Sequence, residues 1–168
     1  MTRVARVVLG IGIALVAGGC AGTRLADGVF HSAKGYRVAV PGPDWQVVSR
    51  TRADLELRHR VEPAGMLVKA SCDGVSTRAD LKALARHLLA GLRDRVVVSA
   101  GEISLNGKVA HHAVLDGRAD DGEDPVRVEL YVMRDARCVY DLLYVAPPAS
   151  FDDWRPAFAR LVESFQTE

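Results

Sequence analysis

Several signatures of enzymes are missing from this sequence. It contains neither the G-x-S-x-G of a hydrolase nucleophile elbow nor the H-E-x-x-H of a zinc protease. It also contains no C-x-x-C pair, which argues against a thioredoxin-like redox centre. These absences predict a non-enzymatic protein that has no catalytic residue, no cofactor and no metal site.

An excess of charge of either sign is also absent. The chain has a formal net charge of +1, and removal of residues 1–19, which hold two arginines and no acid, changes it to −1. General nucleic-acid binders carry a clustered basic surface. We therefore expect no nucleic-acid partner.

The apolar run near the N-terminus is too short to span a membrane. A bilayer span needs about 20 apolar residues, whereas Val7–Val16 supplies ten. Arg3 and Arg6 precede this run, and small residues follow it up to Cys20. A positive start, a short apolar middle and small residues at the end are typical of a secretory signal peptide. We predict such a peptide for residues 1–19.

The segment VAGGC at residues 16–20 resembles the lipobox of bacterial lipoproteins. The resemblance implies that the Cys20 thiol is acylated and that the chain is cut before it. The alternative is an ordinary signal peptide with an incidental cysteine. Ala21 stands where an Asp would retain a lipoprotein in the inner membrane, which implies a lipid anchor in the outer membrane, facing the periplasm. Residues 20–28 then form the lipidated cysteine and a tether of at most about 30 Å.

Two further cysteines, Cys72 and Cys138, remain in the exported chain. An exported protein meets an oxidising compartment, and an even number of cysteines fits a disulfide pair. In the chain-entropy view, closing this loop stabilises the fold by about 4 kcal/mol. The alternative is a pair of buried free thiols, because unpaired cysteine packs like a small hydrophobe.

Residues 29–168 are predicted to form a single α+β domain. Removing 19 of the 168 residues leaves 149, which suits one domain. Alternating apolar and polar residues predict strands at 36–40, 45–48, 55–59, 66–72, 96–105, 108–116, 125–134 and 137–146. Asn106-Gly107 predicts a hairpin turn. The last strand is apolar on both faces apart from Asp141, so we expect it to be central in the sheet.

Two helices complete the predicted domain. The first is expected to start at Ser76 or Thr77, with Asp80 forming a capping box, and to present the leucines of Leu81–Leu92 on one face. The second is expected to start at Ser150. Its apolar stripe, which we expect to pack in the core, comprises Phe151, Trp154, Phe158, Leu161, Val162 and Phe165.

Three segments carry a resemblance to a known fold: Gly35–Pro41 leading to Trp45, the sequence YDLLYVAPPASFDDW at residues 140–154, and the Phe-rich last helix. Together they resemble the PsbP-like fold, which photosystem extrinsic subunits share with eukaryotic Ran-binding regulators and several bacterial lipoproteins. The resemblance implies an antiparallel sheet flanked by helices, an α/β/α sandwich. It also implies a non-catalytic binding or assembly module.

The histidines show no metal-binding spacing. His111 and His112 are adjacent in a predicted strand, where neighbouring side chains point to opposite faces, so they do not readily share one metal. His31, His59 and His87 do not match a ligand pattern either. We expect ordinary structural or exposed histidines.

Two acidic features are candidates for chemistry. Residues 116–124 carry five acids, but without the spacing of a calcium loop, so we expect a solvated hairpin loop. Asp141 in the central strand needs a partner or a neutral state. Arg137 or another arginine is the expected partner, and a functional carboxylate is the alternative.

Three functions follow from these expectations. The first is a lipid-anchored, non-enzymatic envelope protein that attaches to the membrane through its anchor and binds or assembles another envelope protein. The second is a small-ligand or lipid carrier, with a pocket between the sheet and the apolar stripe of the last helix. The third is a hydrolase whose site lies around Asp141 or His111. The predicted anchor, the short tether and the missing catalytic spacings favour the first.

Overall fold

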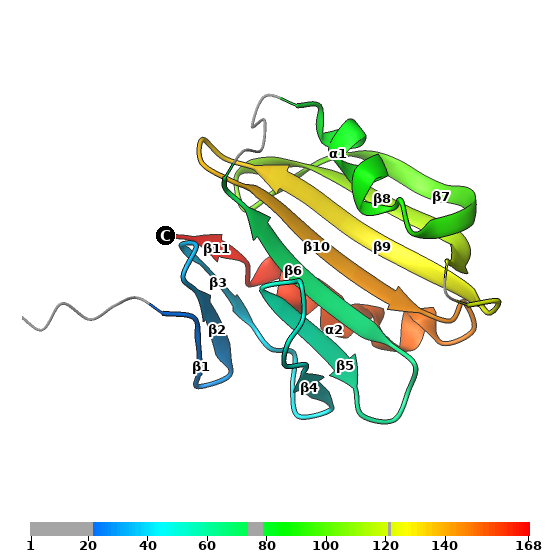
Figure 1. The fold of residues 1–168 in the computed structure, drawn as a ribbon, viewed down its shortest axis with the longest axis horizontal. Helices are drawn as coiled ribbons and strands as arrows, with labels where there is room; N and C mark the ends of the chain where they lie inside the picture. The colour runs from blue at the N-terminus through cyan, green and yellow to red at the C-terminus, as the bar shows by residue number, and fades with distance from the viewer. Residues whose placement is uncertain (1–21, 74–78, 121) are drawn as a thin grey trace, which may run out of the picture.

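The computed structural model describes residues 22–73, 79–120 and 122–168 (Figure 1). The predicted signal peptide at residues 1–19 and the predicted lipidation site Cys20 lie outside the described residues. Over the described part, the chain forms two helices and eleven strands. None of the helices found there is long and apolar enough to cross a membrane.

Seven strands form a large antiparallel sheet. They are β4 (Trp45–Val47), β5 (Leu55–His59), β6 (Gly65–Ser71), β7 (Leu92–Leu105), β8 (Lys108–Ala119), β9 (Pro125–Arg134) and β10 (Val139–Ala146). Their order across the sheet is β4-β5-β6-β10-β9-β8-β7. As predicted, β10 is central, between β6 and β9.

A second, small antiparallel sheet was not predicted as a unit. It comprises β1 (Arg24–Ala26), β2 (Val29–Ser32), β3 (Tyr36–Ala39) and β11 (Gln166–Thr167), in the order β1-β2-β3-β11. The strands β1, β2 and β11 were all missed. In Figure 1 this sheet lies beside the large one, near the C-terminus.

The large sheet lies between the two helices, so the predicted α+β sandwich is confirmed (Figure 1). The helix α2 (Phe151–Glu163) covers one face together with part of the small sheet, and α1 (Leu81–Leu88) covers the β8–β9 part of the other face. In the part of the chain that the structure describes, no helix lies over the β5 and β6 part of the α1 face (Figure 1).

The apolar stripe of α2 is part of the main core. Phe151, Phe158 and the following Phe165 are each at most 2% exposed. The Tyr144 ring lies 4.9 Å from the Phe151 ring and 5.6 Å from the Phe158 ring, between centroids. The stripe therefore packs as expected of a core, although a cavity of about 390 Å³ lies beside Phe158, between β9 and α2. Ser150 occupies the N-cap position of α2, but its side chain forms no capping hydrogen bond.

Helix α1 is shorter than expected. The Asp80 carboxylate accepts a hydrogen bond from a backbone amide of the first turn, so Asp80 is the N-cap. The expected caps Ser76 and Thr77 lie outside the described residues. The helix ends at Leu88, and Leu92 begins β7 instead of continuing the helix, although it stays buried against α1.

A hairpin occupies part of the expected tether. Arg24 in β1 pairs with His31 in β2. Asp27 and Gly28 connect the two strands with φ angles of 50° and 74°, the combination that a two-residue type I′ turn requires. Three residues separate Cys20 from Arg24 in the sequence, so the distance between them is at most about 14 Å.

Candidate functional site

The longest strand of the described chain, β7, is also largely uncovered. Every residue from Arg93 to Ser104 is exposed, so neither helix covers either face of the strand over this stretch. Because β7 is the last strand of the large sheet, its outer main-chain groups face no neighbouring strand. The side chains of Val96, Val97 and Val98 are 53% to 62% exposed. The strand thus presents both main-chain hydrogen-bonding groups and apolar side chains.

The β7 edge is regular over only half of its length. The pairing register with β8 shifts between Arg93 and Val96 and again between Val97 and Ser99. Such irregularities interrupt the pairing of an edge with further strands. The register is continuous from Ser99 to Leu105. We call this stretch the regular edge.

The far end of the regular edge is fixed to α2. Asn106 and Gly107 form the turn between β7 and β8, with φ angles of 50° and 77°, as the sequence predicts. The Asn106 side-chain amide donates hydrogen bonds to the carbonyl oxygens of Glu163, at 3.3 Å, and Phe165, at 2.7 Å. These bonds hold the edge in a constant position relative to the domain.

A buried polar cluster lies between the sheet and α2. The Glu129 carboxylate, in a residue only 2% exposed, accepts hydrogen bonds from Arg155 at 2.8 and 3.1 Å. His112 Nε2 lies 2.7 Å from Glu129 Oε1, and the Tyr131 hydroxyl donates to the same oxygen at 3.3 Å. Burial alone would raise the pKa of Glu129, but hydrogen bonds from His112 and Arg155 outweigh it and lower the pKa to about 2.

This cluster was missed in the sequence because its members come from β8, β9 and α2 without a local spacing. Every oxygen of the Glu129 carboxylate already has a hydrogen-bond donor. The pKa of about 2 keeps the group ionised. Such a carboxylate is suited to holding α2 on the sheet and poorly suited to acting as a general acid or base near neutral pH.

The adjacent histidines point to opposite faces, as predicted. The His112 ring stacks on Tyr131 on the α2 face, with 4.5 Å between ring centroids. His111 lies on the α1 face, where burial and the nearby Lys82 lower its pKa. Within residues 22–73, 79–120 and 122–168, no three His, Cys, Asp or Glu side chains are grouped as a metal site.

The acidic stretch at residues 116–124 is linked to arginines. Asp116 accepts two hydrogen bonds from Arg127, at 2.7 and 2.9 Å, and these bonds hold the pKa of Asp116 below its usual value. Glu123 lies 3.5 Å from both Arg93 and Arg118. A calcium ion would need carboxylate oxygens of this stretch as ligands, and these arginines already bind some of those oxygens.

Asp141 lies on the α1 face of β10. The prediction that Arg137 or another arginine pairs with it is wrong. Arg137 instead donates to the Glu168 carbonyl oxygen at 3.4 Å. The residue opposite Asp141 across the strands is Lys69 of β6. Burial raises the pKa of Asp141 to about 6, and the positive charge of Lys69 offsets part of that effect.

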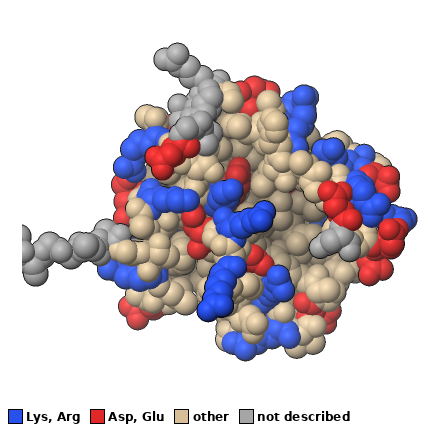
Figure 2. Space-filling model, viewed as in Figure 1, with Lys and Arg blue, Asp and Glu red and all other residues tan. Residues whose placement is uncertain are grey.

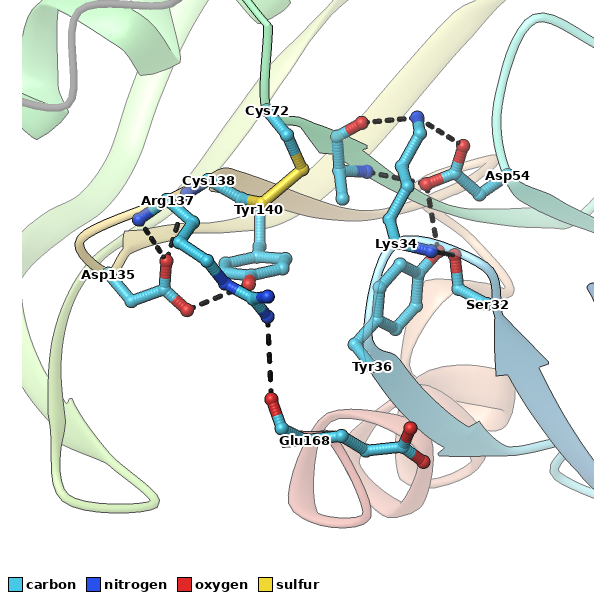
Figure 3. Close-up of a disulfide and its surroundings, with 11 residues drawn as sticks. Ser32, Lys34, Tyr36, Asp54, Cys72, Asp135, Arg137, Cys138, Tyr140 and Glu168 are labelled. Atoms are coloured by element: carbon cyan, nitrogen blue, oxygen red, sulfur yellow. Dashed lines mark hydrogen bonds and ion pairs between the residues drawn. A yellow bond between two sulfur atoms is a disulfide. The ribbon is translucent and has the colours of Figure 1, made fainter. Parts of the chain in front are cut away.

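Cys72 and Cys138 are joined by a disulfide with an S–S distance of 2.11 Å (Figure 3). Of the two alternatives, the structure therefore contains the bonded pair. The bond links the end of β6 to the start of β10, next to the first residue pair that these strands form. Beside it, Asp135 accepts hydrogen bonds from the Cys138 amide at 2.9 Å and the Tyr140 hydroxyl at 2.8 Å, which fixes the turn into β10.

Comparison with known proteins identifies the fold. No protein-family model and no curated protein matches the sequence. Among solved structures, the chain is similar to cyanobacterial PsbP (CyanoP) from Synechocystis sp. PCC 6803, with a TM-score of 0.61 and 15% identity over 94% of this chain and 99% of that one. It is also similar to LpqN, involved in cell envelope biogenesis of Mycobacterium tuberculosis, with a TM-score of 0.57 and 15% identity over 79% and 83%.

A third similar structure is PA94 of Pseudomonas aeruginosa, a protein of unknown function, with a TM-score of 0.52 and 11% identity over 79% of this chain and 90% of that one. Identities this low carry information about the fold and none about shared activity. The two helices, the large antiparallel sheet and these neighbours agree with one another. The chain therefore has a PsbP-like α+β fold.

Proposed function

We propose that this chain is a lipid-anchored, non-enzymatic protein of the bacterial cell envelope that binds a partner protein along β7. The observation that carries the proposal is the uncovered β7 edge. An extended segment of the partner adds to the regular edge, Ser99–Leu105, through main-chain hydrogen bonds. Val96, Val97 and Val98 supply adjoining apolar contacts.

The location rests on the signal sequence and Cys20, and it is supported by the likeness to LpqN, a protein involved in cell envelope biogenesis. The short chain between Cys20 and β1 would keep the domain within about 14 Å of the anchored residue. We place the anchor in the outer membrane, with the domain facing the periplasm. A partner bound along β7 would then be another envelope protein close to the same membrane.

The anchor is tested by Cys20→Ala. Removing the thiol removes the acylation site, so we expect the protein to move from the membrane fraction to the soluble fraction or to persist as the uncut precursor. Fractionation and immunoblotting measure this, and mass spectrometry of the unaltered protein should find the acyl chains on Cys20. Normal membrane attachment of the alanine variant would contradict the proposal.

The β7 interface is tested by a photo-crosslinking amino acid placed at Val97 or Ile103 in living cells. Both positions should give the same adduct with one envelope protein. Val61, which is 83% exposed and lies between β5 and β6, is the matched control and should give no such adduct. Val97→Asp should lower the yield at position 103 by about tenfold, because the interface would bury an unpaired charge. An adduct that forms equally from position 61 would refute the assignment.

A further inference from the structure

The α1 face of the large sheet carries a trough that the proposed β7 interface does not use. Along its floor, β10 places Asp141, Leu143 and Val145, which share one face because strand side chains alternate. The strand rises about 13 Å from Asp141 to Val145. Figure 2 shows this face, where a strip of uncharged residues runs beside a central group of lysines and arginines.

The floor of the trough is apolar in its middle and at one end, along β6 and β10. Leu143 lies opposite Leu67 of β6, and Val145 lies opposite Gly65. A cavity of about 340 Å³ lies beside Gly65, Leu67, Leu143 and Val145, and it is also lined by Glu56, Arg58 and Glu62. A second cavity of about 220 Å³ continues from Leu143 and Val145 to Leu88 of α1.

The other end of the trough is polar. Asp141, Lys69, Ser71 and His87 line a cavity of about 340 Å³ that also includes Leu88, so it adjoins the apolar part. Across the described ranges, none of the ion pairs involves Asp141 or Lys69. The cavity therefore presents a carboxylate and an ammonium group on neighbouring strands, with no close ion pair joining them.

These two parts define the chemistry of a ligand. Half-buried charges are costly unless opposite charges or hydrogen bonds satisfy them. A head with one cationic and one anionic group would satisfy both Asp141 and Lys69. The adjoining apolar surface favours an alkyl chain, at about 25 cal/mol for each Å² of apolar surface that is buried.

We propose that the trough binds a single-chain zwitterionic amphiphile, with its alkyl chain over Leu67, Leu143 and Val145 and its head between Asp141 and Lys69. The cationic group of the head lies against Asp141 and the anionic group against Lys69. The site lies away from β7, which is the last strand at one end of the sheet. Its test is therefore independent of the proposed protein partner.

The test uses a dodecylphosphocholine analogue with a photoreactive group on its alkyl chain, added to membranes that carry the full chain. After irradiation, peptide mass spectrometry should find the label on the segments that contain Leu67 and Leu143. Unlabelled dodecylphosphocholine should compete about tenfold better than dodecyl maltoside, whose head is uncharged. Labelling spread evenly over the surface, or equal competition by the two detergents, would overturn the proposal.

Gly65→Leu is the blocking variant. A Cβ at Gly65 would lie 3.5 Å from the Leu57 carbonyl oxygen and 3.7 Å from a Val145 methyl carbon, which are ordinary contacts, so the leucine projects into the trough without displacing the backbone. Labelling should fall at least about tenfold. Gly101→Leu makes the same change on β7, where a Cβ meets nothing within 4 Å, and should leave labelling unchanged.

Asp141→Asn separates the contribution of the ligand's charged head from that of its alkyl chain. It keeps the shape of the side chain and removes its charge, so labelling by the phosphocholine probe should fall while competition by dodecyl maltoside is preserved. Unchanged labelling in both Gly65→Leu and Asp141→Asn would exclude the site. A chemically crosslinked dimer that Gly65→Leu abolishes would also overturn it, because a second copy of the chain would then fill the trough.

Discussion

A variant carrying both Cys72→Ala and Cys138→Ala is expected to lose about 4 kcal/mol of its free energy of unfolding. The disulfide closes a loop between residues that are 66 positions apart. In the chain-entropy view, closing this loop removes conformational entropy from the unfolded chain and raises its free energy by about 4 kcal/mol. Small domains have total stabilities of about 5–15 kcal/mol, so the loss is a large fraction of the whole. Urea unfolding in the absence of reductant measures it.

Reduction provides the control for this prediction. Adding dithiothreitol to the unaltered protein should lower its stability towards that of the double variant, whereas the variant should not respond. The buried position of Cys138, which is 2% exposed, adds a small packing loss to the variant alone. A double variant that loses less than about 1 kcal/mol would show that the bond does not constrain the unfolded chain as argued.

The second large effect is expected from Arg155→Ala. This change removes the two hydrogen bonds that Arg155 donates to the Glu129 carboxylate and leaves a buried charge with fewer donors. We expect a loss of about 2 kcal/mol at neutral pH. Arg58→Ala is the matched control, because Arg58 is 67% exposed and pairs with Glu56 at 3.2 Å on the surface, where an ion pair contributes less than about 1 kcal/mol.

The same variant should change the dependence of stability on pH. The folded-state pKa of Glu129 is about 2, below its ordinary value of 4.5. Its contribution to stability is therefore complete above pH 4.5 and is lost as the pH falls towards 2. Without Arg155 the pKa is lowered less, so the midpoint of acid unfolding should rise by about one pH unit. An identical acid midpoint in the two proteins would contradict this account.

The strands that were predicted correctly are those with local signals. Asn106-Gly107 requires a tight turn, and the alternating residues on either side of it define β7 and β8 within a few residues. The central position of β10 followed from its two apolar faces. The resemblance in residues 140–154 and around Tyr36 was sufficient for the PsbP-like fold, and these segments form most of β10, the start of α2 and β3.

The features that were missed depend on distant partners or on an unrecognised turn. The pair Asp27-Gly28 carried a hairpin signal, but it lay in a segment interpreted as a tether. Strand β11 has only two residues and exists because Gln166 pairs with Arg37, which no local pattern reveals. The Glu129 cluster likewise depends on the packing of α2 against the sheet. For the same reason, the expectation that Arg137 or another arginine pairs with Asp141 missed Lys69, the residue opposite it on β6.

The pairing of β3 with β11 determines when this domain can finish folding. Gln166 pairs with Arg37, and the Glu168 amide donates to the Gly35 carbonyl oxygen at 2.9 Å. Contacts this far apart in sequence form slowly, because a long loop must close first. During synthesis, β3 would leave the ribosome long before its partner β11 exists. A ribosome stalled before residue 166 would hold a chain whose small sheet lacks β11, and with it the contacts that join the end of the chain to β3.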